Sequence, residues 1–256
     1  EGGEPRACGR DLAEQLARTA DERMRNGIAA VLGGRISPEG YLAPEREDGR
    51  PDREGPADME SLVRRLKETI PFQALFFDNG RFRSLEALAG RLKAFLAGEE
   101  RLLEEAAGHF STGELEIVNG RLVALKDAAW ALEKDILENI GRIAALSGSD
   151  RELNPAAFRK LYHLNFLLNS LDRLEVRGRD SAGIQISFSL PDPESWRAVR
   201  RDLEKRDLAE PFQRRSVPGD LLPGSISVSP PEGGDDRDPG TGRVVSFTFK
   251  TASVVG

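Results

Sequence analysis

The stretch from Leu167 to Leu190 constrains the fold most strongly, because an apolar helix pattern runs into a charged turn and then directly into a strand pattern. Before the turn, leucines recur at every third or fourth position, which is the spacing of a buried helical stripe. After the turn, apolar and polar residues alternate, as in a strand with one buried face. The leucines are Leu161, Leu164, Leu168 and Leu171, and the apolar strand positions are Ile184, Ile186, Phe188 and Leu190.

The turn itself reads R-G-R-D-S-A-G, from Arg177 to Gly183. Its two glycines allow the backbone to turn tightly or to be approached closely by a ligand or a neighbouring chain. Its charged groups would cost free energy if they were buried without partners, so we expect them to pair with one another or with a bound molecule. Spacing alone favours an ordinary turn between a helix and a strand.

The longer run from Leu171 to Gly183, L-D-R-L-E-V-R-G-R-D-S-A-G, resembles the L-x-x-L-E-Y-R-G-Y-D-S-A-G segment of the glutamine–fructose-6-phosphate aminotransferase (isomerizing) family. That segment lies in the family's N-terminal class II glutamine amidotransferase domain, which has an Ntn-hydrolase fold. Val176 and Arg179 stand where the pattern has tyrosines. A weaker similarity covers Val245 to Gly256, which resembles a later strand of long bacterial members. The resemblance implies an enzyme of amino sugar biosynthesis that hydrolyses glutamine and transfers the ammonia to fructose 6-phosphate, giving glucosamine 6-phosphate.

The resemblance also implies roles for individual residues. Arg177 and Gly178 would lie beside the nucleophile, and Asp180 and Ser181 would hold the turn, so that all four support the glutamine site. Glutamine and a sugar phosphate would be the ligands, and no cofactor would be needed. The family's nucleophile is an N-terminal cysteine whose free α-amine acts as the base. Cys8 is a candidate only if the residues before it are removed; otherwise the catalytic residue is unknown and lies upstream.

Other parts of the family's site have no counterpart in this sequence. The H-T-R-W-A-T stretch that positions glutamine is absent. Ile117 to Gly120 resembles part of the oxyanion motif V-V-H-N-G, but it lacks the histidine and precedes the R-G-R-D-S-A-G turn, so we interpret Asn119-Gly120 as a turn or helix boundary. The chain also begins without methionine and stops just after a strand. We therefore expect a fragment of a longer enzyme, inactive in isolation.

The patterning predicts a mainly α chain of α+β type, in which a helical bundle or hairpin insertion leads into a helix and two or three strands of an Ntn-hydrolase-type amidotransferase sheet. Residues 1–150 would form the helical insertion, with a mobile linker near 35–57. Residues 151–256 would form a partial amidotransferase domain with a loop near 218–242. Phe72 to Phe77 is a strand or a helical turn, and Val245 to Phe249 is a strand that can pair with Ile184 to Leu190. The expected helices are Asp11–Leu32, Met59–Ile70, Ser84–Leu96, Glu99–Phe110, Ser111–Leu146 and Asp192–Lys205.

Between Ser111 and Leu146, apolar residues alternate in steps of three and four, as in a coiled-coil seam that contains one polar residue, Asn139. Trp130 and Ile140 flank this seam. It could be an arm for a partner or dimer mate, but an antiparallel helical hairpin is the favoured interpretation. The seam positions are Leu122, Leu125, Ala129, Leu132, Ile136, Asn139, Ile143 and Leu146.

Charge and composition exclude several functional classes. The net charge of −6 disfavours a nucleic-acid surface. A single cysteine and two distant histidines, His109 and His163, offer no metal site. No apolar run is long enough for a membrane span, and no signal sequence opens the chain, so we expect a cytoplasmic protein. The alternative to the enzyme is a non-catalytic helical interaction or oligomerisation module, and either protein can be a homo-oligomer.

Overall fold

A computed structural model describes residues 5–43, 57–147, 153–175, 182–216, 225–229 and 242–251. The chain is mainly α-helical and contains a small three-stranded antiparallel sheet, as the sequence predicts at this level. It divides into two compact units, Glu1–Phe166 and Leu167–Gly256, each of which is described by itself. The domains 1–150 and 151–256 stay a prediction.

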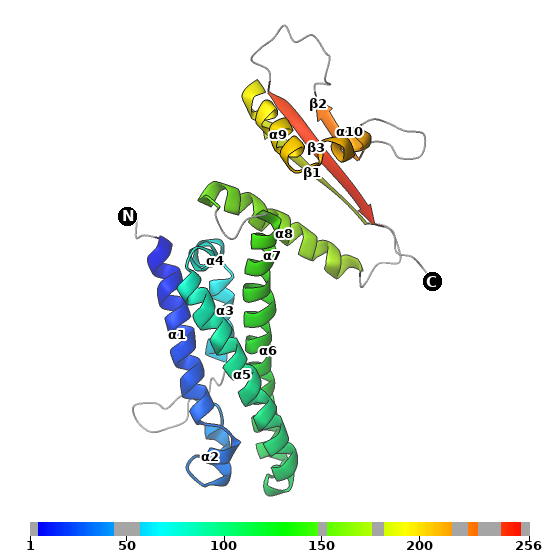
Figure 1. Cartoon of the computed structure of the whole chain (residues 1–256). Coiled ribbons are helices and arrows are strands. Elements are labelled where there is room, and N and C mark those ends of the chain that lie inside the picture. Colours follow the sequence, from blue (N-terminus) through cyan, green and yellow to red (C-terminus); the bar gives the residue numbers. More distant parts are fainter. Residues whose placement is uncertain are drawn as a thin grey trace. The chain divides into compact units, whose positions relative to one another are not determined.

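The first unit is a bundle in which α1, α5 and the continuous run of α6 and α7 lie side by side (Figure 1). Its core contains buried apolar side chains from every long helix of the bundle, among them Leu16, Phe76, Leu88, Leu125 and Phe158. The elements are α1 (Pro5–Arg25), α2 (Ile28–Leu32), η1 (Pro38–Gly40), α3 (Ala57–Leu66), α4 (Thr69–Phe76), α5 (Asn79–Ala106), η2 (Ala107–His109), α6 (Thr112–Ala131), the π-helix η3 (Leu132–Leu137), α7 (Glu138–Ser147) and most of α8 (Pro155–Glu175).

The helix from Thr112 to Ser147 is uninterrupted, although its middle turn is π-helical. It begins with a capping box, in which the Ser111 hydroxyl accepts from the Glu114 N–H and the Glu114 carboxylate accepts from the Ser111 N–H. The turn or helix boundary predicted at Asn119-Gly120 is wrong, because both residues lie inside α6. A glycine inside a helix costs only about 1 kcal/mol relative to alanine, and packing of the apolar face outweighs this cost.

The π-helix explains why the predicted seam is only partly right. Leu122, Leu125, Leu132, Ile136 and Ile143 are buried as predicted. A π-helix forms i→i+5 hydrogen bonds and so accommodates an extra residue in its turn, which changes the face that later residues present. After the π-helix the core contact is Ile140 in place of the predicted Asn139, and the predicted Leu146 is exposed. Before the π-helix the buried residue is Ala128, and the predicted Ala129 beside it is only partly buried. The buried residues of the whole helix are Val118, Leu122, Leu125, Ala128, Leu132, Ile136, Ile140 and Ile143.

Other boundaries also differ from the prediction. The helix expected at Asp11–Leu32 is two helices, α1 and α2, with a turn at residues 26–27. The helix expected at Met59–Ile70 ends at Leu66, and Ile70 belongs to α4. The two helices expected at Ser84–Leu96 and Glu99–Phe110 are one helix, α5, because its buried stripe continues past Gly98. The run from Phe72 to Phe77 is helical and lies mostly in α4. In the segment expected to be a linker, residues 41–43 are buried and form part of the core, α3 begins at Ala57, and residues 44–56 lie outside the described residues.

The second unit contains the sheet. Strand β1 (Ala182–Leu190) pairs antiparallel with β3 (Arg243–Thr251) over its whole length, and β2 (Ile226–Ser229) pairs with the other edge of β3, giving the order β1-β3-β2. The predicted pairing of the strands around Ile184–Leu190 and Val245–Phe249 is therefore confirmed. The helix predicted at 192–205 is α9 (Pro193–Lys205), and it begins with Asp192 accepting from the Ser195 N–H. The sequence analysis missed α10 (Ala209–Ser216) and β2, which lies inside the predicted loop.

The two faces of this sheet differ in polarity. One face carries Ile226, Val245 and Phe247, against which α9 and α10 place Trp196 and Phe212. This packing gives the unit a small core of its own, as an isolated strand pair would need. The opposite face carries polar side chains, and the hydroxyls of the cross-strand pair Ser187 and Ser246 are hydrogen-bonded at 2.8 Å. Alternation of side chains along β1 thus follows the predicted pattern.

Candidate functional site

The segment that carries the predicted glutamine-site residues follows α8, which ends at Glu175. Its last two residues, Ala182 and Gly183, were predicted as part of the turn and belong to β1. Arg177, Gly178, Asp180 and Ser181 lie outside the described residues. The helix and the strand on either side of the turn are present in the predicted order. Gly183, the last residue of the run, pairs with Lys250 in β3.

The candidate nucleophile Cys8 lies in the first turn of α1. Its nitrogen is part of a peptide bond there, so a free α-amine would exist only after removal of the residues that precede it. In the family an apolar strand follows the cysteine. Here Cys8 is followed by the rest of α1, a helix that is polar on average. The side chain of Cys8 itself lies outside the described residues.

The two histidines serve local contacts. The His109 Nδ1 lies 3.3 Å from the Ala106 carbonyl oxygen, and the His163 ring meets the Tyr162 ring edge-on at a centroid distance of 5.9 Å. In the described part of the chain, no group of three or more His, Cys, Asp or Glu side chains is placed to hold a metal ion.

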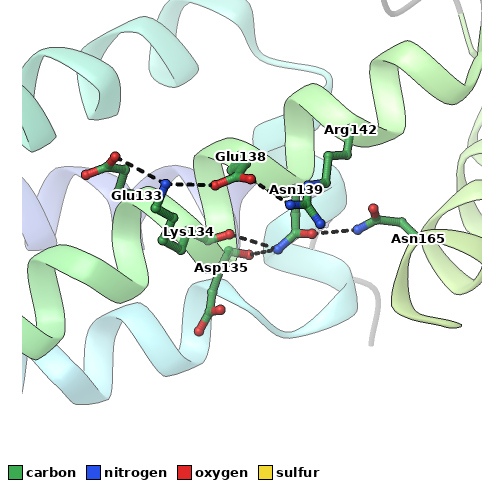
Figure 2. Close-up of polar contacts among 7 residues, drawn as sticks. All are labelled: Glu133, Lys134, Asp135, Glu138, Asn139, Arg142 and Asn165. Carbon is green, nitrogen blue, oxygen red and sulfur yellow. Dashed lines mark hydrogen bonds and ion pairs between the residues drawn. The ribbon is translucent and has the colours of Figure 1, made fainter. Parts of the chain in front are cut away.

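A polar contact joins the π-helical turn to α8 (Figure 2). The side-chain amide of Asn139 donates to the carbonyl oxygens of Lys134, at 3.1 Å, and Asp135, at 3.0 Å. Its Oδ1 accepts from Nδ2 of the buried Asn165, at 2.7 Å. Asn139 therefore satisfies carbonyl groups of the widened turn and fixes α8 against it. The position expected to be polar inside a coiled-coil seam instead makes a specific hydrogen bond between two helices.

A row of charges lies beside this contact (Figure 2). Lys134 bridges Glu133 and Glu138, and Glu138 also binds Arg142 at 2.7 Å. Lys134 and Arg142 hold the pKa of Glu138 below its usual range, and Glu138 holds the pKa of Lys134 above its own. A shallow, wide-open depression of about 450 Å³ lies between this row and α5. Its lining residues are Glu86, Ala89, Gly90, Lys93, Glu133, Leu137 and Glu138.

A second polar cluster is buried inside the bundle, centred on Glu99 of α5. The Glu99 side chain is only 4% exposed, and its Oε2 accepts from the Ile28 N–H at 2.8 Å, at the start of α2. A Cβ on Gly27 would lie 2.6 Å from Glu99 Oε1, so glycine makes room for the carboxylate. Burial raises the pKa of Glu99, while the Ile28 N–H and the Tyr41 hydroxyl lower it.

The rest of the cluster holds the segment that follows α2. Buried Arg23 donates to the Leu42 carbonyl oxygen at 2.8 Å, and Asn26 donates to that of Ala43 at 2.6 Å. Burial, and after it the charge of Glu99, raise the pKa of Tyr41 above its ordinary value. The Tyr41 hydroxyl makes no well-aligned hydrogen bond. We conclude that this cluster holds the backbone in place: Glu99 fixes the start of α2 to α5, and Arg23 and Asn26 fix residues 42–43 to the end of α1.

The sequence analysis missed this cluster, although one signal was present. Glu99 occupies a stripe position of α5, since the buried residues around it are Leu88, Leu92, Leu96 and Leu103. A charged residue at an apolar position of a helix is expected to have a partner, because an unpaired buried charge is costly.

These elements define a mainly helical protein with a small antiparallel sheet. Comparison with protein-family models, with curated proteins and with solved structures finds no match to this chain. Among the described residues, no helix combines the length and the apolar character that crossing a membrane requires.

Proposed function

We propose that the chain forms part of a glutamine-dependent amidotransferase that resembles glutamine–fructose-6-phosphate aminotransferase. The observation that carries this proposal is the run from Leu171 to Gly183. Six of its last seven residues agree with the family's R-G-Y-D-S-A-G pattern, and Arg179 is the one that differs. Its position between a helix and a strand supports the proposal, because the family's segment has the same order. The sheet of this unit would then belong to an Ntn-hydrolase-type fold.

In this proposal the residues of the turn position other groups and do not themselves make or break bonds. Arg177 and Gly178 order the nucleophile, and Asp180 and Ser181 hold the turn in which they lie. The helical unit is an insertion that adds no residue to the glutamine site. The 256-residue chain alone is inactive, because it lacks the H-T-R-W-A-T stretch and places Cys8 in a helix.

The test uses the complete product of the native gene, assayed for glutamate release from glutamine and for glucosamine 6-phosphate formation from fructose 6-phosphate. We expect both activities. Asp180→Asn should lower kcat/KM for glutamine by roughly 100-fold, because a displacement of reacting groups by about 1 Å costs this much. Asp202→Asn, an exposed residue of α9, is the matched control and should leave the rate unchanged.

Two results would contradict the proposal. If the complete gene product released no glutamate from glutamine, the proposal that it is an amidotransferase would be refuted. Turnover of glutamine by the 256-residue chain that Cys8→Ala abolishes would show instead that this chain holds its own nucleophile.

The second candidate is a non-catalytic interaction module, and a specific observation favours it. Val123 and Trp130 of α6 are exposed by 54% and 57%, and because they lie seven residues apart they are on the same face of the helix. Large apolar side chains that gather on a surface mark interaction sites more often than isolated ones do. Failure of the glutaminase assay, with the fold intact, would make this candidate the preferred one.

A further inference from the structure

The outer edge of β1 is open in the part of the chain that the structure describes. β1 borders β3 on one side, and no described strand pairs with its other side. The edge of a sheet presents unpaired N–H and C=O groups in a row, which can bind another strand. β1 is the long edge of this sheet, with nine residues, whereas the opposite edge strand, β2, has four.

β1 lacks the features by which edge strands usually avoid pairing. Natural edges carry charged side chains, proline or bulges, or they are short. The sequence of β1, A-G-I-Q-I-S-F-S-L, contains no charged residue and no proline. Its register with β3 advances one residue at a time from Ala182 to Leu190, without a bulge. The strand is therefore well suited to pair along its whole length.

The apolar face of the sheet is only partly covered near this edge. Helices α9 and α10 bury Ile226 and Val245, near β2 and the middle of the sheet. On the same face, Phe188 of β1 remains 40% exposed and Phe249 of β3 48% exposed. A strand added beside β1 would bring its own apolar side chains against this face and remove part of it from water.

We propose that β1 pairs antiparallel with β1 of a second copy of this chain, about a twofold axis at Ile186, to form a continuous six-stranded sheet. This register overlaps all nine residues of the strand. It places Ile186 opposite itself and Ile184 opposite Phe188 of the partner subunit on the apolar face. On the polar face it places Gln185 opposite Ser187 of the partner subunit.

A second copy fits this edge because the pattern of β1 is complementary to itself. In this register apolar side chains lie opposite apolar ones and polar side chains lie opposite polar ones. Because β1 has no charged residue, the pairing places no like charges opposite each other. Most homodimers have this twofold symmetry, in which the same surface serves both subunits. The observations behind this proposal, residues 182–190 and the pairing of β1, are separate from those that carry the amidotransferase proposal.

The first test measures the mass of the purified 256-residue chain by sedimentation across a concentration series. We expect a species of twice the 28.1 kDa chain mass. The double variant Gln185→Lys/Ser187→Lys places lysine opposite lysine twice at the axis, and like charges directly opposite destabilise a strand pair, so the dimer dissociation constant should rise by roughly tenfold or more. The control Ser227→Lys/Thr248→Lys adds the same charge to the same face, on β2 and β3, and should remain dimeric.

The second test fixes the register by disulfide cross-linking, in a Cys8→Ser background. Directly opposite residues of an antiparallel pair have Cα atoms about 4.5–5.5 Å apart, within reach of a disulfide, so Ile186→Cys should give a covalent dimer under mild oxidation. Ser189→Cys is the control, because the two cysteines would be offset by six residues, or about 20 Å along the strands.

Circular dichroism confirms in each case that the variant is folded. A wild-type chain that stays monomeric over the whole series would overturn the proposal. So would a dimer that the lysine pair at positions 185 and 187 leaves as tight as before, or cross-linking that is as efficient at Ser189→Cys as at Ile186→Cys.

Discussion

Replacement of Glu99 by alanine should destabilise the helical unit by about 2 kcal/mol. The carboxylate is 4% exposed and accepts the Ile28 N–H at 2.8 Å, so its removal leaves that N–H buried without an acceptor. An unsatisfied buried donor costs roughly 1–3 kcal/mol. The truncated side chain also leaves a void, which adds to the loss of stability. Removal of a buried charge is favourable and offsets part of the loss from the unsatisfied N–H and the void. The sum is near the middle of the range.

Replacement by glutamine separates the charge from the hydrogen bond. The Glu99→Gln side chain keeps an oxygen that can accept from the Ile28 N–H, so we expect a much smaller loss than for alanine at neutral pH. Burial raises the pKa of Glu99 above its ordinary value of 4.5, which means that the folded chain holds this proton more tightly than the unfolded chain. The stability of the wild type therefore falls as the pH rises from 4.5 through the raised pKa.

The assay is urea unfolding followed by helical circular dichroism, at a series of pH values from acidic to neutral. The free energy of unfolding of the wild type minus that of Glu99→Gln should decrease with rising pH in this window and become constant above it. Glu104→Gln, an exposed residue of the same helix, is the matched control. A difference that rises with pH, or an alanine variant as stable as the wild type, would refute the assignment of Glu99 as a buried, hydrogen-bonded carboxylate.

Three further changes test other contacts. Tyr41→Phe should alter the free energy of unfolding by less than about 1 kcal/mol, because the buried hydroxyl makes no well-aligned hydrogen bond; a larger loss in urea unfolding would show that it has a partner. Asn139→Ala should cost about 1–3 kcal/mol, and a double-mutant cycle with Asn165→Ala should give a coupling above about 0.5 kcal/mol, whereas additive losses would exclude the hydrogen bond between them. Ser111→Ala should cost about 1 kcal/mol through loss of the helix cap, and thermal unfolding that is unchanged would contradict it.

The sequence predicted the elements that depend on regular patterns over several residues. The alternation from Ile184 to Leu190 gave the strand and the correct faces, and its pairing with the strand around Val245 was confirmed. Most of the stripe between Leu122 and Ile143 was predicted, including Leu132 and Ile136 of the π-helix. The pattern alone could not reveal the π-helix itself, because steps of three and four residues continue through it while the backbone hydrogen bonds change.

The polar contacts were less predictable, because they join residues that are distant in the sequence. Asn139 stood out as a polar residue in an apolar seam, but its partner Asn165 lies on another helix. Glu99 and Ile28 are separated by 71 positions, and nothing local identifies the Ile28 N–H as the group that needs an acceptor. Such pairs are set by tertiary packing, whereas propensity and periodicity act within one element.

The two proposals concern adjacent segments of the chain, and their tests are independent. The enzyme proposal rests on residues 177–181 of the turn, and the dimer proposal on residues 182–190 of β1. If Asp180→Asn lowers kcat/KM for glutamine by roughly 100-fold while the mass of the 256-residue dimer is unchanged, the turn supports a glutamine site and the edge serves assembly. If the gene product releases no glutamate but the dimer forms and is broken by Gln185→Lys/Ser187→Lys, β1 is an assembly strand and the resemblance in the turn reflects sequence alone. The uncharged nine-residue edge then has a physical explanation that requires no glutamine chemistry, because burial of the edge in a twofold sheet protects it from other strands.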